Sequence, residues 1–396
     1  MKTLKGFMLG MGAVMALTFT ACGSEPQLTA SGLDPAKFDT IINGDSVKLY
    51  TLKGDKGMEV CITNYGGRVV SLMVPDKNGK LVDVVLGYDN IAQYADTKNS
   101  PSDYGSSVGR YANRINMGRF ELNGQPIQLK QNDKHDGGRD HCLHGGGDSG
   151  WMNKVYKAEQ PDSTTLRLTI VAEDGENGFP GRVEATTTYR IVNGNTLDIT
   201  WEAKTDKPTI INQTNHNYYN LSGDFEHDGL DQIICVNADS FTVADASYMP
   251  TGEIRAVEGT PMDLRHNKAL KETIDREYDQ IKNANGGYDH NWCLNTYALE
   301  DPESQPCATL YSPKTGIFME MFTTEPGVQV YTGNFQGIGN EPNIRHKLDK
   351  KYPQYVSVCL ESQKYPDSPN HPEWPSPVVI PEKPYKSHAA YKFTTK

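Results

Sequence analysis

Apolar and polar residues alternate along many stretches of this chain, and Asn-Gly pairs separate several of them. The alternation is clear in 183–192 and again in 196–203, on either side of Asn193-Gly194. A period of two is the pattern of a half-buried strand, and Asn-Gly between two such runs is the strongest short signal of a β-hairpin. The same pair recurs at 78–79 and 123–124. The pattern therefore predicts antiparallel strands joined by tight turns.

Helical periodicity, by contrast, is sparse. The best short candidate is 266–274, HNKALKETI. All-β domains often run to about 250 residues as one unit, and the sequence shows no internal repeat and no low-complexity linker after residue 40. We therefore expect an all-β fold, a large antiparallel sandwich with few short helices, in a single domain over 41–396.

The first 40 residues have a different character. Two lysines precede an apolar run over 6–21, which is short for a membrane-spanning helix of about 20 residues. The sequence FTAC at 19–22 resembles the lipobox of bacterial lipoproteins, in which the cysteine is lipidated; a plain secretory signal is the alternative. We expect a lipoprotein signal peptide over 1–21, lipidation of Cys22 and a tether over 22–40. The protein would then be periplasmic or anchored to the outer membrane of a bacterium, and bound to the membrane only through the lipid.

Charge and cysteine content bear on the expected partners and bonds. The net charge is -11, with 50 acidic and 39 basic residues. Because phosphate binding needs clustered Lys and Arg, we expect no nucleic acid partner. Six cysteines follow Cys22, far apart and without a CxxC pair. Export permits disulfides, but a domain of this size does not need them, so we expect mostly buried free thiols and leave one bridge open.

Short polar segments interrupt the strands and carry the candidate chemical groups. The segment 210–223, IINQTNHNYYNLSG, places four asparagines around His216. Asparagine is unfavourable in both strands and helices, because its side chain competes for main-chain hydrogen bonds. We therefore interpret the segment as a polar network in which the asparagines hold the ring of His216 by hydrogen bonds. Similar segments carry Asn113, Arg114, His144, Asp289, Gln329 and Glu361.

These residue types suit a polyhydroxylated ligand. Amides and an arginine bind hydroxyls by hydrogen bonds, and histidine with glutamate supplies acid–base chemistry. Each residue taken alone also has an ordinary explanation: His144 precedes three glycines and fits a turn, and Glu361 fits the exposed end of a strand. The sequence contains no HExxH motif, no CxxC pair and no EF-hand spacing, so we expect no metal and no cofactor.

Taken together and in order, these segments resemble the aldose 1-epimerase family, also called galactose mutarotases. The matching segments are GRYANRI (109–115), LHGG (143–146), DGENGFPG (174–181), TNHNYYNLSG (214–223), YDHNWCL (288–294), PGVQVYTGNF (326–335) and LESQKYPDSPN (360–370). The resemblance extends from about residue 40 to the C-terminus. It implies a galactose-mutarotase-like antiparallel β-supersandwich, in agreement with the alternation.

The resemblance also implies a reaction, the interconversion of the α and β anomers of free aldoses such as glucose and galactose. Carried over by motif, Glu361 is the general base, His216 is the general acid and His144 assists at the sugar ring. The residues implied to bind sugar hydroxyls are Asn113, Arg114, Asp289 and Gln329. The mechanism requires His216 to be protonated and Glu361 ionised when the sugar arrives. Their ordinary pKa values, near 6.5 and 4.3, meet this requirement under mildly acidic conditions.

Departures from the family pattern are small. Ser362 stands where the family usually has Thr, and Tyr219 and Trp374 stand where Phe is common. Because they lie beside the implied site in the sequence, we expect them to affect which sugar fits.

Two other functions stay open from the sequence. A non-catalytic sugar-binding lipoprotein would keep the binding groups without needing the acid and base. A glycoside hydrolase would in most cases need two carboxylates about 5–9.5 Å apart, for which Asp289 is the one candidate partner of Glu361. The sequence does not disclose the preferred aldose, and we expect a monomer.

Overall fold

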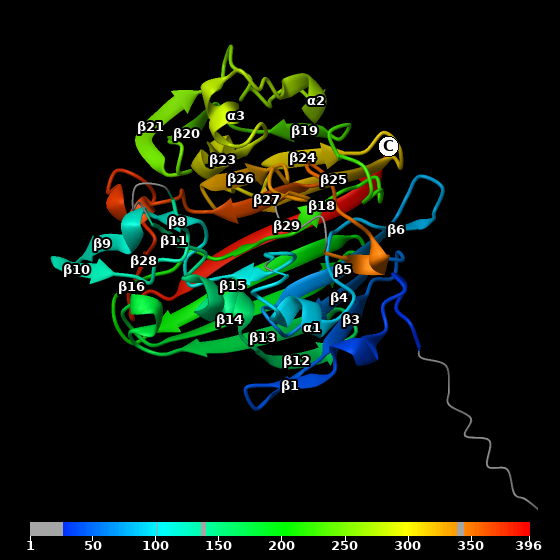
Figure 1. The fold of residues 1–396 in the computed structure, drawn as a ribbon, viewed down its shortest axis with the longest axis horizontal. Coiled ribbons are helices and arrows are strands. Elements are labelled where there is room, and N and C mark those ends of the chain that lie inside the picture. Colours follow the sequence, from blue (N-terminus) through cyan, green and yellow to red (C-terminus); the bar gives the residue numbers. More distant parts are fainter. Residues whose placement is uncertain (1–26, 101, 136–139, 339–343) are drawn as a thin grey trace, which may run out of the picture.

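The structure, a computed structural model, describes residues 27–100, 102–135, 140–338 and 344–396. Within these ranges antiparallel β-sheets dominate (Figure 1). The largest sheet has nine strands, in the spatial order β12 (Lys157–Asp162), β13 (Thr165–Ala172), β14 (Val183–Val192), β15 (Thr196–Thr205), β29 (Tyr385–Thr395), β25 (Ile317–Thr323), β24 (Ala308–Tyr311), β19 (Ile233–Val236) and β22 (Lys268–Ala269).

Two smaller sheets and several strand pairs complete the β structure. The six-stranded sheet has the order β18 (Tyr218–Tyr219), β27 (Val358–Gln363), β26 (Gly327–Tyr331), β23 (Asp289–Cys293), β20 (Ser240–Ala244) and β21 (Pro250–Ala256). The four-stranded sheet has the order β3 (Leu49–Lys53), β4 (Glu59–Thr63), β5 (Arg68–Pro75) and β6 (Leu81–Asp83). The pairs are β1 (Thr40–Ile42) with β2 (Asp45–Val47), β7 (Ser107–Val108) with β17 (Thr214–Asn215), β8 (Arg114–Ile115) with β11 (Cys142–Leu143), β9 (Arg119–Leu122) with β10 (Gln125–Gln128), and β16 (Thr209–Ile210) with β28 (Val378–Val379).

Helices in the described residues are short. The α-helices are α1 (Ile91–Ala95), α2 (Leu270–Thr273) and α3 (Asp279–Asn283). The 3₁₀ turns are η1 (Pro35–Phe38), η2 (Asn116–Gly118), η3 (Gly147–Ser149), η4 (Trp151–Asn153), η5 (Glu176–Gly178), η6 (Asn295–Ala298), η8 (Lys347–Asp349) and η9 (Ser368–Asn370). Of the helix predicted over 266–274, only the single turn α2 forms, because Lys268 and Ala269 pair with β19 as strand β22. No helix of the described residues has both the length and the apolar character needed to cross a membrane.

The Asn-Gly hairpins form where the sequence predicts them. Between β9 and β10, Asn123 and Gly124 have φ of 52° and 76° and make a two-residue turn. Between β14 and β15, Asn193 and Gly194 have φ of 53° and 71°. A turn of this hand matches the twist of the strands, and Asn and Gly adopt it at low cost. The alternation along β14 and β15 then places their apolar residues on one buried face.

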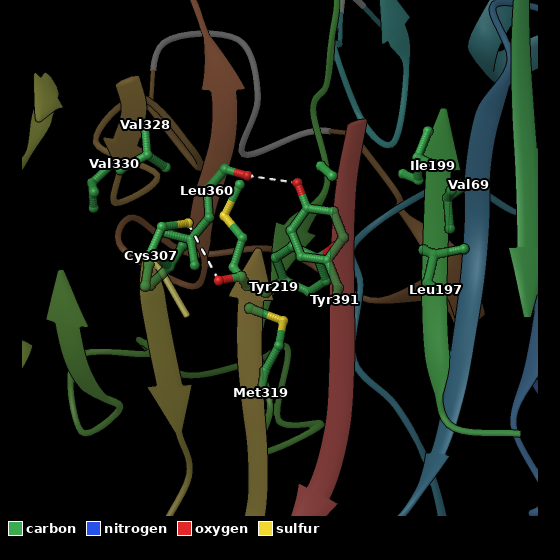
Figure 2. Packing of buried hydrophobic residues seen from close by; sticks show 14 of the residues in the cluster. Val69, Leu197, Ile199, Tyr219, Cys307, Met319, Val328, Val330, Leu360 and Tyr391 are labelled. Carbon is green, nitrogen blue, oxygen red and sulfur yellow. Dashed lines mark hydrogen bonds between the residues drawn. The ribbon is translucent and has the colours of Figure 1, made fainter. Parts of the chain in front are cut away.

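One hydrophobic cluster connects the three large sheets. In Figure 2, Leu197 and Ile199 of β15 lie beside Val69 of the four-stranded sheet. On the other side, Leu360 of the six-stranded sheet faces Tyr391 of β29, whose hydroxyl donates to the Leu360 carbonyl oxygen at 2.9 Å. All five residues are almost completely buried. The nine-stranded sheet therefore packs one face against both smaller sheets in one continuous core, and the all-β supersandwich is confirmed.

The chain packs onto this core before residue 41. Leu33 and Phe38 are 1% and 0% exposed and join a second apolar cluster. The Ala30 N–H donates to Glu59 Oε1 at 2.7 Å, and Ser31 Oγ donates to Ser71 Oγ at 3.0 Å. The packed body thus includes the end of the expected tether over 22–40, and its boundary lies near residue 29. The expected signal peptide and Cys22 lie outside the described residues. The six cysteines from residue 61 onward are unpaired.

Candidate active site

A cavity of about 260 Å³ opens beside the six-stranded sheet. Its lining residues are Ser102, Asp103, Tyr104, Asn113, Arg114, Leu143, His144, His216, Tyr218, Asp289, Tyr331, Phe335, Gln336 and Glu361. Pockets for drug-sized ligands have volumes of roughly 300–1,000 Å³. A slightly smaller cavity with this many polar groups is suited to one small polar ligand.

The pairing of β18 with β27 brings His216 and Glu361 together across 145 residues of sequence. Tyr218 pairs with Cys359 in an antiparallel register. Two residues before Tyr218 and two residues after Cys359, the same register places residue 216 opposite residue 361. The Nε2 atom of His216 lies 3.5 Å from Oε1 of Glu361. Their side chains are only 5% and 2% exposed. An imidazole and a carboxylate thus share one buried position at the cavity.

Alternation along the six-stranded sheet builds the polar wall next to Glu361. On β26 and β27, Gln329 pairs directly with Glu361, so both side chains leave the same face of the sheet. The neighbours in the strands, Val328 and Leu360 among them, point the other way into the core. Gln329 Nε2 donates to Asp289 Oδ1 at 2.7 Å. Gln329 is therefore behind Asp289 and orients its carboxylate, and Gln329 itself does not line the cavity.

His144 and Asn113 hold each other beside a short strand pair, since Asn113 directly precedes β8 and His144 directly follows β11. The His144 N–H donates to the Asn113 carbonyl oxygen at 3.2 Å, and the Asn113 N–H donates to Nδ1 of His144, also at 3.2 Å. Because Nδ1 accepts a hydrogen bond, the proton of the neutral ring is on Nε2. The following Gly145 has φ of 79°, and a Cβ there would lie 2.3 Å from the Gly109 carbonyl oxygen. Only glycine fits this turn, which is the physical reason for glycine after His144.

Arg114 is held at the cavity by an acid that the sequence did not single out. Its Nε donates to Asp133 Oδ2 at 2.7 Å, and its guanidinium lies over the ring of Tyr248, 4.9 Å from the centroid. The Arg114 and Asp133 side chains are 11% and 16% exposed. An ion pair this shielded from water fixes the guanidinium at the cavity wall.

The asparagines around His216 do not hold its ring, and the prediction that they do was wrong. Asn212, Asn215 and Asn220 donate their amide protons to main-chain carbonyls of neighbouring segments at 2.7–3.4 Å. Asn217 donates to a tyrosine hydroxyl at 3.0 Å. The Nδ1 atom of His216 has no hydrogen-bond partner among the described residues. The asparagines instead tie an irregular buried segment to its neighbours, where no regular ladder satisfies the carbonyls.

Aromatic packing orients the ring of His216. It stacks on Tyr218 with centroids 4.8 Å apart and an interplanar angle of 16°. The ring of His144 meets it edge-on at 5.4 Å, and Tyr331 does so at 6.4 Å. Main-chain bonds fix the backbone of His216 on both sides: its N–H donates to the Ser106 carbonyl oxygen, and its carbonyl accepts from the Gly105 N–H, both at 2.9 Å. Packing against these rings, and not a hydrogen bond, therefore fixes the orientation of the imidazole, with Nε2 facing Glu361.

Burial opposes both charged forms that the reaction requires. It lowers the pKa of His216 to about 3. It raises the pKa of Glu361 well above its ordinary value, and the nearby carboxylates of Asp289 and Asp103 raise it further. Burial also lowers the pKa of His144 and raises that of Asp289. Burial thus works against the expectation from ordinary pKa values, since it favours the neutral His216–Glu361 pair over the ion pair.

The structure adds cavity residues that the sequence did not identify. Asp103 and Tyr104 come from the loop before β7, and Phe335 and Gln336 follow β26. The signal for the last two was available, since Phe335 ends the segment PGVQVYTGNF and Gln336 directly follows it. In contrast, Ser362, Tyr219 and Trp374, which we expected to affect sugar fit, do not line the cavity. Tyr219 points into the core, as Figure 2 shows.

Some of the cavity groups are of types that bind metal ions elsewhere. Ligand atoms of Asp103, His144 and His216 lie within 4.8 Å of one another, and so do those of His216, Cys359 and Glu361. Both sets use His216, and a metal there would displace the proton that acid catalysis needs. A metal-free reaction stays a prediction that chelation can test.

Comparison with known proteins agrees with the geometry. The family model described as aldose 1-epimerase matches residues 48–392. The chain is 33% identical to galactose mutarotase of Rattus norvegicus over 351 residues, which are 89% of this chain and 95% of the rat protein. It is 31% identical to aldose 1-epimerase of Escherichia coli over 353 residues, 89% of this chain and 96% of the bacterial protein.

Solved structures show the same fold. An aldose epimerase homologue from C. elegans superposes with a TM-score of 0.78 at 25% identity and covers 88% of this chain and 99% of its own. Galactose 1-epimerase from Lactobacillus acidophilus gives a TM-score of 0.74 at 27% identity, with coverage of 90% and 97%. The family match over most of the chain, the similar relatives and the shared fold agree with one another, and this chain belongs to the aldose 1-epimerase family.

Proposed function

We propose that the protein is an aldose 1-epimerase that interconverts the α and β anomers of free aldoses in the cavity around His216 and Glu361. The observation that carries the proposal is the 3.5 Å separation of His216 Nε2 and Glu361 Oε1, both buried at a small polar cavity. The similar relatives are epimerases and mutarotases, which favours this function over a hydrolase or a non-catalytic sugar-binding protein.

The reaction needs two proton transfers, at the two sugar oxygens that are bonded to C1. Glu361 accepts the proton of the O1 hydroxyl, and His216 donates a proton to the ring oxygen. The C1–O5 bond then breaks and gives the open-chain aldehyde. Rotation about C1–C2 exposes the other face of the carbonyl, and the reversed proton transfers close the ring as the other anomer. Each positioned acid or base contributes about 10²–10⁴-fold to such a rate.

The pKa directions suit the open-chain state. When the ring is open, Glu361 holds the proton and His216 is neutral, which is the form that burial favours. The ion pair that starts the reaction carries the same number of protons as the neutral pair, so transfer of one proton from Glu361 to His216, 3.5 Å apart, prepares the site. Burial therefore lowers the cost of the intermediate relative to the buried ion pair. Sugar hydroxyls that enter the cavity supply hydrogen bonds to the charged form.

In this proposal the remaining predicted residues at the cavity bind the sugar, and Gln329 positions one of them. His144 presents an Nε2–H donor, and Arg114 presents N–H donors that Asp133 holds in place. Asn113 lines the same wall, and Asp289 accepts hydroxyl protons while Gln329 holds its carboxylate. The cavity thus offers both donors and acceptors, and each sugar hydroxyl can form hydrogen bonds with either kind.

Polarimetry of freshly dissolved α-D-glucose, α-D-galactose and α-D-xylose tests the function. The purified protein should speed the decay of rotation well above the spontaneous rate. The Glu361→Gln variant is the control, and its rate should be near the spontaneous one. A chelator such as EDTA should leave the rate unchanged. No acceleration for any aldose would exclude the proposed function.

We further propose that the protein is an exported lipoprotein, on the strength of the apolar run over 6–21 and the FTAC sequence at 19–22, and that it is a monomer. Residues 1–21 would be the signal peptide, and Cys22 would carry the lipid. In a bacterial host, the Cys22→Ala variant should leave the membrane fraction and lose labelling by a radioactive fatty acid. Labelling that survives this substitution would exclude Cys22 as the modified residue, and light scattering after gel filtration tests the monomer.

A further inference from the structure

Asp103 stands out among the cavity residues because its carboxylate is unengaged. It is half-buried and lines the cavity, yet its oxygens form no ion pair and accept no hydrogen bond from a described residue. The other acids near the cavity lie against protein groups: Asp289 accepts from Gln329, Asp133 accepts from Arg114, and Glu361 Oε1 lies 3.5 Å from His216. A carboxylate at a cavity wall without a protein donor is available to a donor on the ligand.

The loop holds Asp103 firmly on both sides. Arg68, which is 1% exposed, donates from Nη1 to the carbonyl oxygens of Ser102 and Tyr104 at 3.1 and 3.2 Å. Ser106 donates from its N–H and its hydroxyl to the carbonyl oxygen of Asp103 at 3.0 and 2.9 Å. A buried arginine and a serine thus fix the main chain that carries this carboxylate, so its place in the cavity is set before any ligand binds.

The position of Asp103 relative to His216 indicates which part of a sugar it meets. One oxygen of Asp103 lies within 4.8 Å of ring nitrogens of His144 and His216, while Glu361 belongs to a different close group around His216. In the proposed reaction His216 meets the ring oxygen, and Glu361 meets O1 on C1. The ring oxygen has two carbon neighbours, C1 and C5. If C1 lies beside Glu361, then Asp103, the other acid beside His216, lies near C5 and the substituent of C5.

We propose that Asp103 is a specificity-determining residue that accepts a hydrogen bond from the C6 hydroxyl of a hexose. This inference rests on the proposed function, because it uses the roles of His216 and Glu361 to orient the sugar. Asp103 then favours hexoses with a free O6–H over 6-deoxy sugars and pentoses, which lack the donor. It also disfavours sugars with a carboxylate or a phosphate at C6, which meet a like charge.

The size of the preference follows from the kind of bond. A hydrogen bond to a charged group is stronger than a neutral one, and a site built to receive a hydroxyl rejects a ligand that leaves it unpaired. We expect at least about a tenfold preference in kcat/KM. The comparison uses D-galactose, 6-deoxy-D-galactose and L-arabinose, which have the same ring configuration and differ only at C5.

The experiment measures mutarotation kinetics on these three sugars for the wild type and for the variants Asp103→Ala and Asp103→Asn. Asp103→Ala should lower kcat/KM for galactose at least about tenfold and leave that for L-arabinose within about threefold. Asp103→Asn keeps a neutral acceptor, so its kcat/KM for galactose should fall less than that of Asp103→Ala. Asp55→Ala, which removes the same charge from an exposed turn, is the matched control and should change none of the values.

The outcomes separate this inference from the proposed function. No acceleration for any sugar overturns the proposed function. Equal kcat/KM of the wild type for the three sugars overturns the role of Asp103 and leaves the epimerase intact, and this result does not depend on whether a variant folds. An equal loss for all three sugars in Asp103→Ala also overturns the role, because it would show that Asp103 acts on the histidines instead of the C6 hydroxyl.

Discussion

Replacing Glu361 by Gln should remove activity while the protein stays at least as stable as the wild type. Glutamine has nearly the same shape, so the 3.5 Å contact with His216 and the packing at a 2% exposed position are kept. It cannot accept the O1 proton. The loss of a positioned general base is expected to lower kcat about 100- to 10,000-fold, or roughly 3–5 kcal/mol in activation free energy.

The stability effect has the opposite direction, and its pH dependence follows from the raised pKa. The unfolded chain releases the Glu361 proton near pH 4.3, while burial keeps the folded pKa well above that value. The wild type therefore loses stability as the pH rises above about 4.3, until the folded pKa is reached, at about 1.4 kcal/mol for each unit of pKa difference. Glu361→Gln lacks this loss. Its free energy of unfolding should match the wild type near pH 4 and equal or exceed it at pH 7.5.

Polarimetry at 25 °C and urea unfolding at pH 4 and 7.5 measure both effects on the same preparations. Turnover within about tenfold of the wild type would remove Glu361 from the role of base. A variant that is less stable than the wild type at pH 7.5 would contradict the reasoning from burial, because lost activity would then follow from lost structure.

Three further substitutions test other parts of the structure. His216→Asn should lower kcat at least about 100-fold with a smaller change in KM, since it removes a proton donor and not a main sugar contact; stopped-flow polarimetry that shows equal loss in both would make His216 a binding residue. Asn220→Ala removes the donor to two main-chain carbonyls and should lower the free energy of unfolding in urea by about 1–3 kcal/mol. The folded variant should keep its activity. A stable but inactive variant would indicate that the asparagines do act on the ring of His216. His388 lies between Asp198 and Glu303, which raise its pKa to about 9 against the effect of burial. The stability that it contributes is complete below pH 6.5 and is lost as the pH rises through about 9, so unfolding at pH 7 and 10 should differ less in His388→Gln, and an unchanged difference would contradict the assignment.

Much of the fold was predictable from the sequence because it depends on local patterns. Alternation marked β14 and β15, and Asn-Gly marked their hairpin. The partners of the strands were not predictable in this way. The pairing of β18 with β27, which brings residues 216 and 361 together, is set by packing across the whole core. Only the family resemblance pointed to that pair.

The site residues divide along the same line. The sequence motifs identified His144, Asn113 and Arg114, because the residues next to them in the sequence form the turns that place them. They could not reveal Asp133 as the partner of Arg114, or Asp103 as a cavity residue, because both come from loops whose position depends on distant contacts. The error over the asparagines has a simple physical origin. Closeness in sequence to an imidazole does not decide where an amide bonds, because buried main-chain carbonyls without ladder partners accept the amide protons.

The structure of Glu361→Gln with bound D-galactose tests the central claim most directly. The account predicts the O1 hydroxyl within about 2.6–3.2 Å of the side chain of residue 361, and the ring oxygen within the same distance of His216 Nε2. A sugar bound in the cavity with its anomeric carbon turned away from both side chains would contradict it.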